Sequence, residues 1–206
     1  MRVSVSVLSN YNRLIEAVKK VNNTSADFLH VDVMDGIFVS DEKFPLEVVK
    51  DIKRISLKPL DVHLMVNDCS TVMKYASLKP DYLTFHVEII NDIKLINEVK
   101  KLGVKVGLAI NPDTNVQKLF PYIKMIDLIL FMSVEPGKGG QAFKEEVLNK
   151  VSVIKDMVSD KTIISIDGGI NDRTVRLCKH AGCNMVVSGS FVTSANDYEQ
   201  KIKELR

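Results

Sequence analysis

Residues 28–36 read Phe28-Leu29-His30-Val31-Asp32-Val33-Met34-Asp35-Gly36, a stretch in which apolar and polar side chains alternate before a glycine. Side chains two residues apart share a face of an extended strand, so His30, Asp32 and Met34 lie together. The residues between them are leucine and valine, which makes the opposite face wholly apolar. This pattern predicts a strand whose apolar face is covered by helices and whose polar face leads to a ligand site.

Short runs of this kind recur along the chain and alternate with longer amphipathic stretches. Such alternation is typical of parallel strands joined by crossover helices. Strands are predicted at Val3–Leu8, Phe28–Met34, Leu60–Met65, Tyr82–His86, Lys105–Ile110, Leu128–Met132, Thr162–Ile166 and Met185–Val187. Helices are predicted at Asn12–Val21, Leu46–Ile55, Ile93–Leu102, Glu145–Val158 and Arg173–Lys179, with a last helix between Ala195 and Leu205.

The length of the chain limits the architecture that these elements can form. A strand, a helix and two loops take roughly 25 residues, so eight such units need about 200. The chain has 206 residues. We therefore predict an α/β fold, one (β/α)₈ TIM barrel that spans residues 1–206 as a single domain. A doubly wound open sheet is the structural alternative.

The composition is that of an ordinary globular chain, with 46% hydrophobic and 26% charged residues. Its 28 basic and 26 acidic residues are mixed along the sequence, so we expect neither nucleic acid nor a membrane as a partner. The longest apolar run, residues 125–132, is interrupted by Asp127 and is too short to span a bilayer. No signal peptide is recognised at residues 1–6, and three cysteines without CxxC spacing suggest neither a disulfide framework nor a zinc ribbon. A cytoplasmic location is the expectation.

Polar and glycine-rich segments gather where the predicted strands end. The strand Leu60–Met65 alternates like residues 28–36 and places Asp61 and His63 on one face. Asp167 ends a strand and is followed by two glycines, and the last strand leads into Ser188-Gly189-Ser190. The loops after the last two strands of such barrels commonly bind a phosphate. A third glycine-rich segment, residues 135–141, has neither P-loop nor dinucleotide spacing, so no nucleotide is predicted.

Two histidines and two aspartates at one barrel mouth are difficult to explain by packing, because an unpaired buried charge is costly. Two imidazoles with two carboxylates would make a site for one divalent metal ion such as Zn²⁺, Mn²⁺, Fe²⁺ or Co²⁺. Each residue taken alone has a simpler interpretation. A single histidine such as His86 is more often a core or surface residue, and methionines in strands usually fill a core.

Several segments combine these features in a fixed order: HVDVMDG at 30–36, DVHLMV at 61–66, TFHVE at 84–88, MSVEPG at 132–137 with Gln141, and DGGI at 167–170. Together they resemble the ribulose-phosphate 3-epimerase family across nearly the whole chain. Each fragment is weak by itself, whereas the joint match is specific. The resemblance implies a barrel of the ribulose-phosphate-binding type that interconverts D-ribulose 5-phosphate and D-xylulose 5-phosphate with one divalent metal ion. It also implies a homo-oligomer.

Carried over position by position, the resemblance assigns His30, Asp32, His63 and Asp167 as metal ligands. It also makes Asp32 and Asp167 the catalytic acid/base pair, which suits an inversion at C3 because a proton leaves one face and another returns to the opposite face. Substrate and phosphate contacts fall on Ser6, His63, Gly137, Lys138, Gly139, Gly140, Gly168, Gly169, Gly189 and Ser190. Methionines that line the family's site correspond to Met34, Met65 and Met132.

Two departures from the family pattern bear on the substrate. Lys138 stands where the family usually has an aromatic residue, and its ammonium could reach the phosphate or lie in solvent. The loop Ile37–Phe44 replaces the family's usual His-Phe-Val-Pro-Asn. An epimerase for a six-carbon substrate such as D-allulose 6-phosphate therefore stays open, as does a non-catalytic sugar-phosphate-binding barrel. A decarboxylase is not favoured, because no lysine lies beside Asp32 or His63 on their strands.

Overall fold

The apolar runs pair side by side as parallel strands in the computed structural model, which describes residues 1–138 and 140–206. β1 pairs with both β2 and β9, so eight parallel strands close into a ring and the predicted (β/α)₈ barrel is confirmed. The open-sheet alternative is wrong, because its outermost strands would pair on one side only. The strands are β1 (Arg2–Ser6), β2 (Phe28–Asp35), β3 (Glu42–Lys43), β4 (Leu60–Met65), β5 (Tyr82–His86), β6 (Lys105–Ile110), β7 (Leu128–Met132), β8 (Ile163–Asp167) and β9 (Met185–Ser188).

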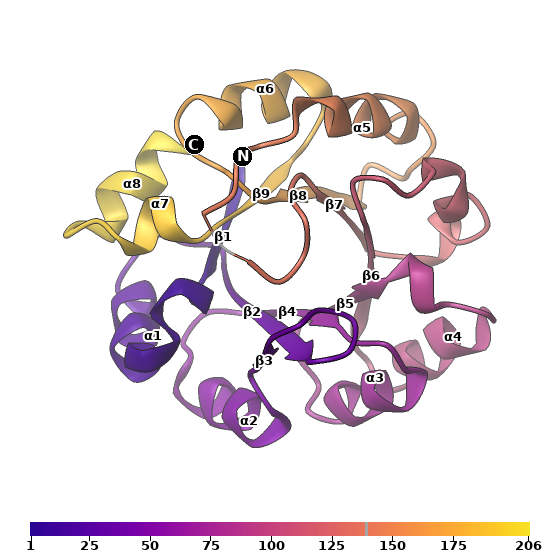
Figure 1. The fold of residues 1–206 in the computed structure, drawn as a ribbon, viewed down its shortest axis with the longest axis horizontal. Helices are drawn as coiled ribbons and strands as arrows, with labels where there is room; N and C mark the ends of the chain where they lie inside the picture. Colours follow the sequence, from indigo (N-terminus) through magenta and orange to yellow (C-terminus); the bar gives the residue numbers. More distant parts are fainter. Residues whose placement is uncertain (139) are drawn as a thin grey trace.

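Alternating side chains divide the apolar core into two layers, one on each side of the strands. Tyr82, Leu128, Leu130 and Met185 belong to a cluster that fills the barrel. The opposite faces of the strands form a larger cluster with the helices. Figure 1 shows the ring of strands with the helices outside it. Both faces of each strand are therefore covered, as a parallel sheet requires.

Helices follow most of the strands along the chain, and two of these helices begin at aspartate caps. The Asp68 carboxylate accepts a hydrogen bond from the Thr71 N–H at the start of α3, and Asp197 accepts one from the Gln200 N–H at the start of α8. The helices are α1 (Leu14–Asn22), α2 (Leu46–Ile55), α3 (Cys69–Ala76), α4 (Lys94–Lys101), α5 (Leu148–Ile154), α6 (Thr174–Ala181), α7 (Ser190–Thr193) and α8 (Tyr198–Glu204). Of these, α3 and α7 were not predicted.

Some predicted elements were too long, because tight turns replace their ends. The first strand ends at Ser6 rather than Leu8, since residues 8–13 turn as a 3₁₀ helix. The helix predicted at Glu145–Val158 is a 3₁₀ turn followed by α5, which ends at Ile154. Such 3₁₀ turns are frequent at helix starts and satisfy backbone groups that lack α-helical partners.

Two connections depart from the alternation of strand and helix. Between β6 and β7, where every residue is described, the chain forms the 3₁₀ turns Val116–Leu119 and Ile123–Met125 in place of an α-helix. Pro121 lies between them and lacks the N–H that a longer helix needs. After β2 the chain returns as the short strand β3, which pairs antiparallel with Met34 and Asp35. The sequence did not predict this hairpin.

Gly107 allows the inner surface of the barrel to close around Thr84. A Cβ atom added at Gly107 would lie 2.3 Å from Thr84 Oγ1 and 3.1 Å from Leu128 Cδ2. We predict that Gly107→Ala lowers the free energy of unfolding by about 1–3 kcal/mol, the usual cost of overpacking a filled core. Urea denaturation measures the change. The double variant with Thr84→Ala lacks the closest clash, so its loss should be smaller than the sum of the single losses. Additive losses would contradict this packing.

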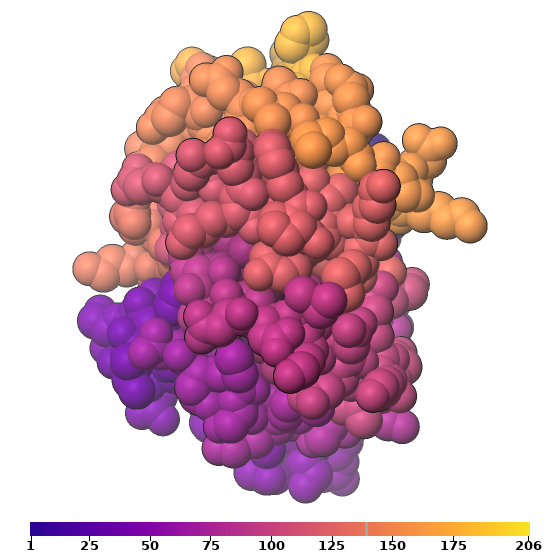
Figure 2. Space-filling view, turned by 90° about the vertical axis from the view of Figure 1, so that its right-hand side faces the viewer, coloured from indigo at the N-terminus to yellow at the C-terminus, as the bar shows by residue number. Residues whose placement is uncertain are grey.

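The two ends of the chain meet on one side of the barrel (Figure 1). The Arg206 guanidinium donates to the Met1 carbonyl at 3.3 Å and to the Asp27 carboxylate at 2.8 Å. Figure 2 shows the intervening segments following one another over the surface in chain order, from indigo below to orange above. None of the helices in the described part of the chain is long and apolar enough to cross a membrane.

Candidate active site

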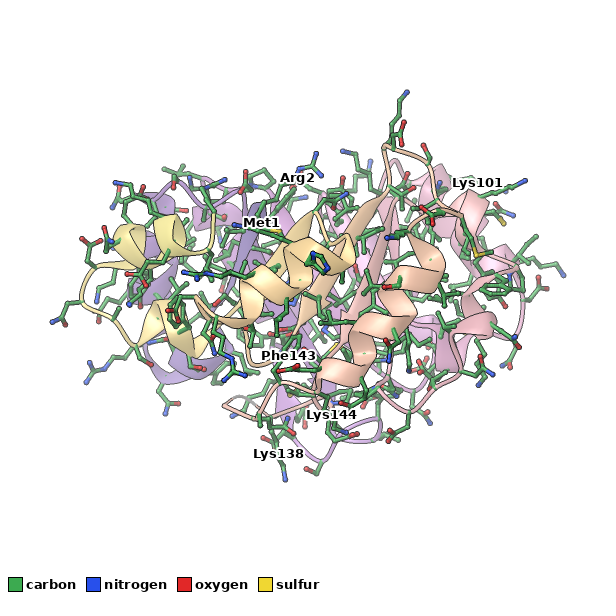
Figure 3. All side chains as sticks on the ribbon, turned by 90° about the horizontal axis from the view of Figure 1, so that it is seen from above. Met1, Arg2, Lys101, Lys138, Phe143 and Lys144 are labelled. Atoms are coloured by element: carbon green, nitrogen blue, oxygen red, sulfur yellow. The ribbon has the colours of Figure 1, made fainter. Side chains whose placement is uncertain are left out.

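A cavity of about 730 Å³ opens at the carboxyl ends of the strands, the end where barrels of this fold bind ligands. Its lining comes mainly from the loops after β1, β7, β8 and β9. Figure 3 shows Lys138, Phe143 and Lys144 at this end of the barrel, with Met1 and Arg2 at the other. The cavity is therefore formed by connections, while the strands below it supply the fixed side chains.

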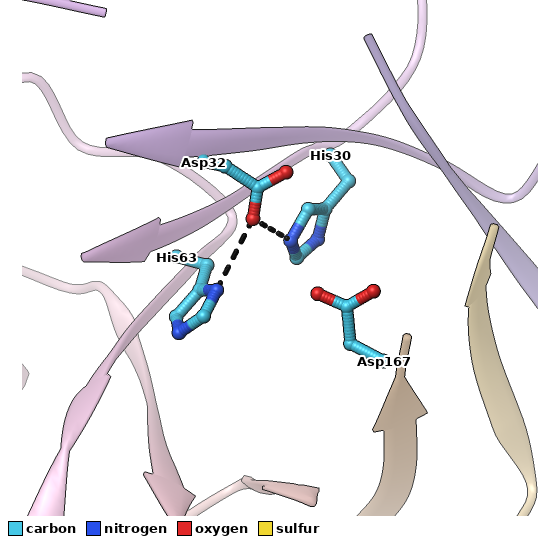
Figure 4. Close-up of side chains that lie close together, drawn as sticks. All are labelled: His30, Asp32, His63 and Asp167. Carbon is cyan, nitrogen blue, oxygen red and sulfur yellow. Dashed lines mark hydrogen bonds and ion pairs between the residues drawn. The ribbon is translucent and has the colours of Figure 1, made fainter. Parts of the chain in front are cut away.

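Four side chains from three strands meet at the base of these loops (Figure 4). They are His30 and Asp32 of β2, His63 of β4 and Asp167 of β8. One ligand atom from each residue lies within 4.8 Å of the others. Asp32 Oδ1 is 3.1 Å from His30 Nε2 and 3.2 Å from His63 Nδ1. The structure thus brings together the four residues that we predicted as ligands, and this cluster could hold a metal ion.

Contacts behind the cluster determine which nitrogen of His30 faces it. Asp61 Oδ2 lies 2.8 Å from His30 Nδ1 and accepts a second hydrogen bond from Ser4 Oγ at 2.9 Å. A carboxylate only accepts hydrogen bonds, so His30 Nδ1 carries a proton and Nε2 is the nitrogen that faces Asp32. A lone pair on Nε2 would repel the Asp32 oxygen unless a proton or a metal cation lies between the two atoms. Two imidazole nitrogens and two carboxylates therefore fit a divalent cation, and Asp61 orients one of the imidazoles.

The two carboxyl groups of the cluster differ in their affinity for a proton. Burial raises the pKa of Asp167 to about 7, and the negative charge of Asp32 adds to the rise. Burial acts on Asp32 in the same sense, but the charge and hydrogen bonds of His30 and His63 hold its pKa well below the usual value. Burial also disfavours the charged form of His30, yet Asp32 and Asp61 outweigh it and raise the pKa of His30. Near neutral pH one carboxyl group can thus be protonated while the other is ionised.

Most of the residues predicted to contact substrate border the cavity. The Ser6 hydroxyl donates to Asp32 Oδ2 at 2.7 Å. Gly168 has a φ of +113°, and a Cβ there would lie 2.5 Å from Val134 Cγ2, so only glycine fits the turn that follows Asp167. The predicted contact residues among the lining are Ser6, Gly137, Lys138, Gly140, Gly168, Gly169, Gly189, Ser190, Met65 and Met132.

Three other predicted contact residues are placed differently. Met34 is 2% exposed and is not among the lining residues, because β3 pairs beside it at the end of β2. His63 is fully buried within the cluster. Gly139 lies outside the described residues. Of the two positions open to Lys138, the structure favours solvent, since its side chain is exposed and points away from the barrel in Figure 3.

Sequence reasoning missed three polar residues that lie behind the cluster: Asp61, His86 and Glu88. His86 is the last residue of β5, and its Nε2 lies 3.0 Å from His63 Nε2. Burial lowers the pKa of His86 to about 4. Burial alone would raise the pKa of Glu88, but hydrogen bonds from His86, Thr114 and Asn111 lower it to about 2. The usable signal was the position of His86 at the carboxyl end of a predicted strand, the same signal that identified Asp167.

Fold and site together define a (β/α)₈-barrel protein whose ligand cavity carries a cluster able to hold a metal ion. The model of the ribulose-phosphate 3-epimerase family matches residues 2–193, and the chain belongs to this family. The resemblance noted in the sequence is thereby confirmed. The family is one of enzymes, carbohydrate isomerases that act as epimerases.

Full-length relatives support this membership. Ribulose-phosphate 3-epimerase of Helicobacter pylori is 35% identical over 214 residues, which cover 100% of this chain and 97% of that protein. The Bacillus subtilis protein of the same name is 36% identical over 213 residues, with 100% and 98% covered. The chloroplastic ribulose-5-phosphate-3-epimerase of Arabidopsis thaliana is 37% identical over 212 residues, with 99% and 75% covered.

Solved structures of other barrels are similar in fold. Orotidine 5'-phosphate decarboxylase from Pyrococcus horikoshii superposes with a TM-score of 0.70 at 11% identity, covering 98% of this chain and 96% of that one. Phosphoribosyl anthranilate isomerase from Thermococcus kodakaraensis has a TM-score of 0.71 at 16% identity, covering 99% and 96%. At these identities the likeness shows the shared barrel alone.

Proposed function

We propose that the chain inverts C3 of a ketose phosphate and so interconverts D-ribulose 5-phosphate and D-xylulose 5-phosphate. The observation that carries the proposal is the presence of Asp32 and Asp167 in one cavity, the first with a lowered pKa and the second with a raised one. Membership of the ribulose-phosphate 3-epimerase family supports the same reaction.

Inversion needs a group on each side of the substrate that can exchange a proton with C3. Asp32 and Asp167 come from different strands, β2 and β8, and both line the cavity, so each can serve one side. In one direction the ionised Asp32 removes the proton and the protonated Asp167 returns one, and in the reverse direction the roles are exchanged. The hydrogen bond from Ser6 orients the Asp32 carboxylate for this transfer.

The cluster of His30, Asp32, His63 and Asp167 would hold one divalent cation, for which Zn²⁺, Mn²⁺, Fe²⁺ and Co²⁺ are the candidates. Such a cation supplies positive charge that stabilises the negative charge developing on the substrate when C3 loses its proton. The two imidazoles are fully buried and keep water away from the inner side of the cluster.

We place the phosphate group of the substrate against the loops after β8 and β9. Gly168, Gly169, Gly189 and Ser190 line this part of the cavity, and small residues allow backbone N–H groups to approach an anion. Arg173 also lines the cavity and adds a positive charge there. Methionine thioethers elsewhere in the lining have no exchangeable proton that could compete with the two aspartates.

The proposal is tested by incubating protein loaded with each of the four metals in D₂O with D-ribulose 5-phosphate. We expect NMR to show deuterium at C3 together with the appearance of D-xylulose 5-phosphate. No deuterium at C3 with any metal would reject catalysis and would favour a sugar-phosphate-binding barrel without activity.

A second cavity of about 270 Å³, which shares Glu135, Gly137 and Lys138 with the first, gives the six-carbon alternative a structural basis. It lies against Phe38 and Val39 of the loop that departs from the family pattern. The same D₂O experiment is therefore run with D-allulose 6-phosphate at equal concentration. We expect faster turnover of the pentose phosphate, and a hundredfold preference for the hexose phosphate would transfer the proposal to that substrate.

The homo-oligomeric state and the cytoplasmic location stay predictions. Light scattering tests the first, and cell fractionation tests the second.

A further inference from the structure

We propose that His86 and Glu88 are positioning residues that hold His63 in the tautomer whose Nδ1 can bind the cation. This inference rests on the metal site of the proposed function. Three side chains lie in a row behind that site: Glu88 Oε2 is 3.2 Å from His86 Nδ1, and His86 Nε2 is 3.0 Å from His63 Nε2. Both histidine side chains are fully buried, so water cannot replace these contacts.

The proton positions along this row follow from the hydrogen bonds of Glu88. Its Oε1 accepts from the Asn111 N–H at 2.9 Å and from Thr114 Oγ1 at 2.6 Å. Burial would raise the pKa of Glu88, but its hydrogen bonds lower it to about 2, so Glu88 is a carboxylate and its Oε2 can only accept from His86 Nδ1. His86 therefore carries its proton on Nδ1.

The same reasoning continues from His86 to the cluster. A neutral imidazole has a single N–H, so His86 Nε2 is an acceptor and the hydrogen bond between the rings is donated by His63 Nε2. The remaining nitrogen of His63, Nδ1, then presents a lone pair 3.2 Å from Asp32 Oδ1. His30 Nε2 faces the same oxygen, and Asp61 holds the opposite nitrogen of that ring. Each imidazole thus turns one nitrogen to the same Asp32 oxygen, while Asp61 holds the far nitrogen of His30 directly and Glu88 holds that of His63 through His86.

Packing keeps the row in place. The centroid of the His86 ring lies 5.1 Å from that of the His63 ring and 4.4 Å from that of the Phe38 ring. Phe38 belongs to the loop Ile37–Phe44, and its amide donates to Asp35 Oδ1 at 2.8 Å. Lys150 donates to the carbonyls of Asn111 at 3.0 Å and Thr114 at 2.6 Å, which fixes the segment that Glu88 holds. The unusual loop therefore packs against the row through Phe38.

Two variants of His86 separate a positioning role from a merely structural one. His86→Leu removes the acceptor for His63 Nε2–H, whereas the side-chain carbonyl of His86→Gln can still accept this hydrogen bond. We expect the affinity for Zn²⁺, measured by competition with a chelator, to fall about 10- to 100-fold in His86→Leu, as for other outer partners of metal-binding histidines. His86→Gln should recover most of the loss. A folded His86→Leu with unchanged affinity, or equal losses in both variants, would overturn the inference.

The wild-type protein provides a second measurement that does not depend on how the variants fold. The chain has four histidines, so ¹⁵N spectra of histidine-labelled, Zn²⁺-loaded protein can be assigned with single substitutions. We expect the proton of His63 on Nε2 and the metal on Nδ1, with the proton of His86 on Nδ1. The opposite arrangement, or no Zn²⁺ binding at all, would overturn the inference. Neither measurement uses a substrate, so a protein that binds Zn²⁺ in this way but does not epimerise would refute the proposed reaction alone.

Discussion

Asparagine in place of Asp167 will lower kcat for C3 epimerisation by about three orders of magnitude, the usual contribution of a proton-transferring side chain. The amide keeps the shape of the carboxyl group and an oxygen that can bind a cation, but it can neither accept nor return a proton at neutral pH. The wild-type group suits the task, because burial and the charge of Asp32 raise its pKa to about 7. The other carboxylate of the four-residue cluster, Asp32, serves the opposite side of the substrate in the proposed reaction, so it cannot take this role as well.

The measurement is deuterium exchange in D₂O combined with metal analysis of the variant. In the proposed mechanism Asp32 serves one side of the substrate, so it should still exchange the C3 hydrogen of one epimer with solvent, but inversion should be lost. Asp32→Asn should abolish inversion as well, with additional loss of metal, since its Oδ1 approaches both imidazoles. Asp172→Asn is the matched control, because Asp172 is exposed in the same loop and is not among the lining residues. More than a few per cent of wild-type inversion in metal-loaded Asp167→Asn would reject the two-base mechanism.

Three of the four cluster residues could be predicted because alternation along a strand is a local property. His30 and Asp32 are two residues apart, and each position of β2 needs only its neighbours to determine its face. His63 follows from the same rule in β4. Asp167 was recognisable by its position before two glycines at a strand end. Closure of the sheet was predictable from length, since eight units account for nearly all of the 206 residues.

Contacts between strands could not be predicted, because they depend on the stagger of the sheet. Asp61 is the residue of β4 that pairs with His30 of β2, and this register brings its carboxylate to His30 Nδ1. On the other side of β4, His63 pairs with Thr84, yet its ring contacts His86, two residues further along β5. The alternation of residues along a single strand predicts neither the contact of Asp61 with His30 nor that of His86 with His63. Partners behind the cluster were therefore missed although the cluster itself was found.

The hairpin after β2 was missed for a different reason. Its strand β3 has two residues, and it is held by the pairs Met34–Lys43 and Asp35–Glu42 rather than by an apolar pattern of its own. Val39, within this hairpin, approaches Gly137 so closely that an added Cβ there would lie 2.9 Å from Val39 Cβ. Contacts of this kind join two loops that are far apart in the sequence, so no local sequence pattern predicts them.

Alanine in place of His63 will remove most of the bound metal and most of the activity. The substitution deletes one of the two imidazoles in the proposed metal site, and the remaining imidazole with two carboxylates is a weaker set for Zn²⁺ or Co²⁺. Zn²⁺ affinity should fall further than the roughly 10- to 100-fold expected when an outer partner is lost. Mass spectrometry measures the metal content of the purified variant, and competition with a chelator measures its Zn²⁺ affinity. His180→Ala is the control, because His180 is an exposed histidine on α6.

The ranking of three histidine variants by their Zn²⁺ affinity is more informative than the affinity of any one variant. His63→Ala should lose the most Zn²⁺ affinity, His86→Leu an intermediate amount and His180→Ala none, because the three positions are in the cluster, behind it and remote from it. An unchanged metal content in His63→Ala would remove His63 from the ligand set, and the lone pair on its Nδ1 would then need another explanation. If His63→Ala and His86→Leu lost equal Zn²⁺ affinity, His63 would contribute to Zn²⁺ binding only in the tautomer that His86 selects. The hydrogen bond between the two rings would then be as important for Zn²⁺ affinity as the imidazole of His63.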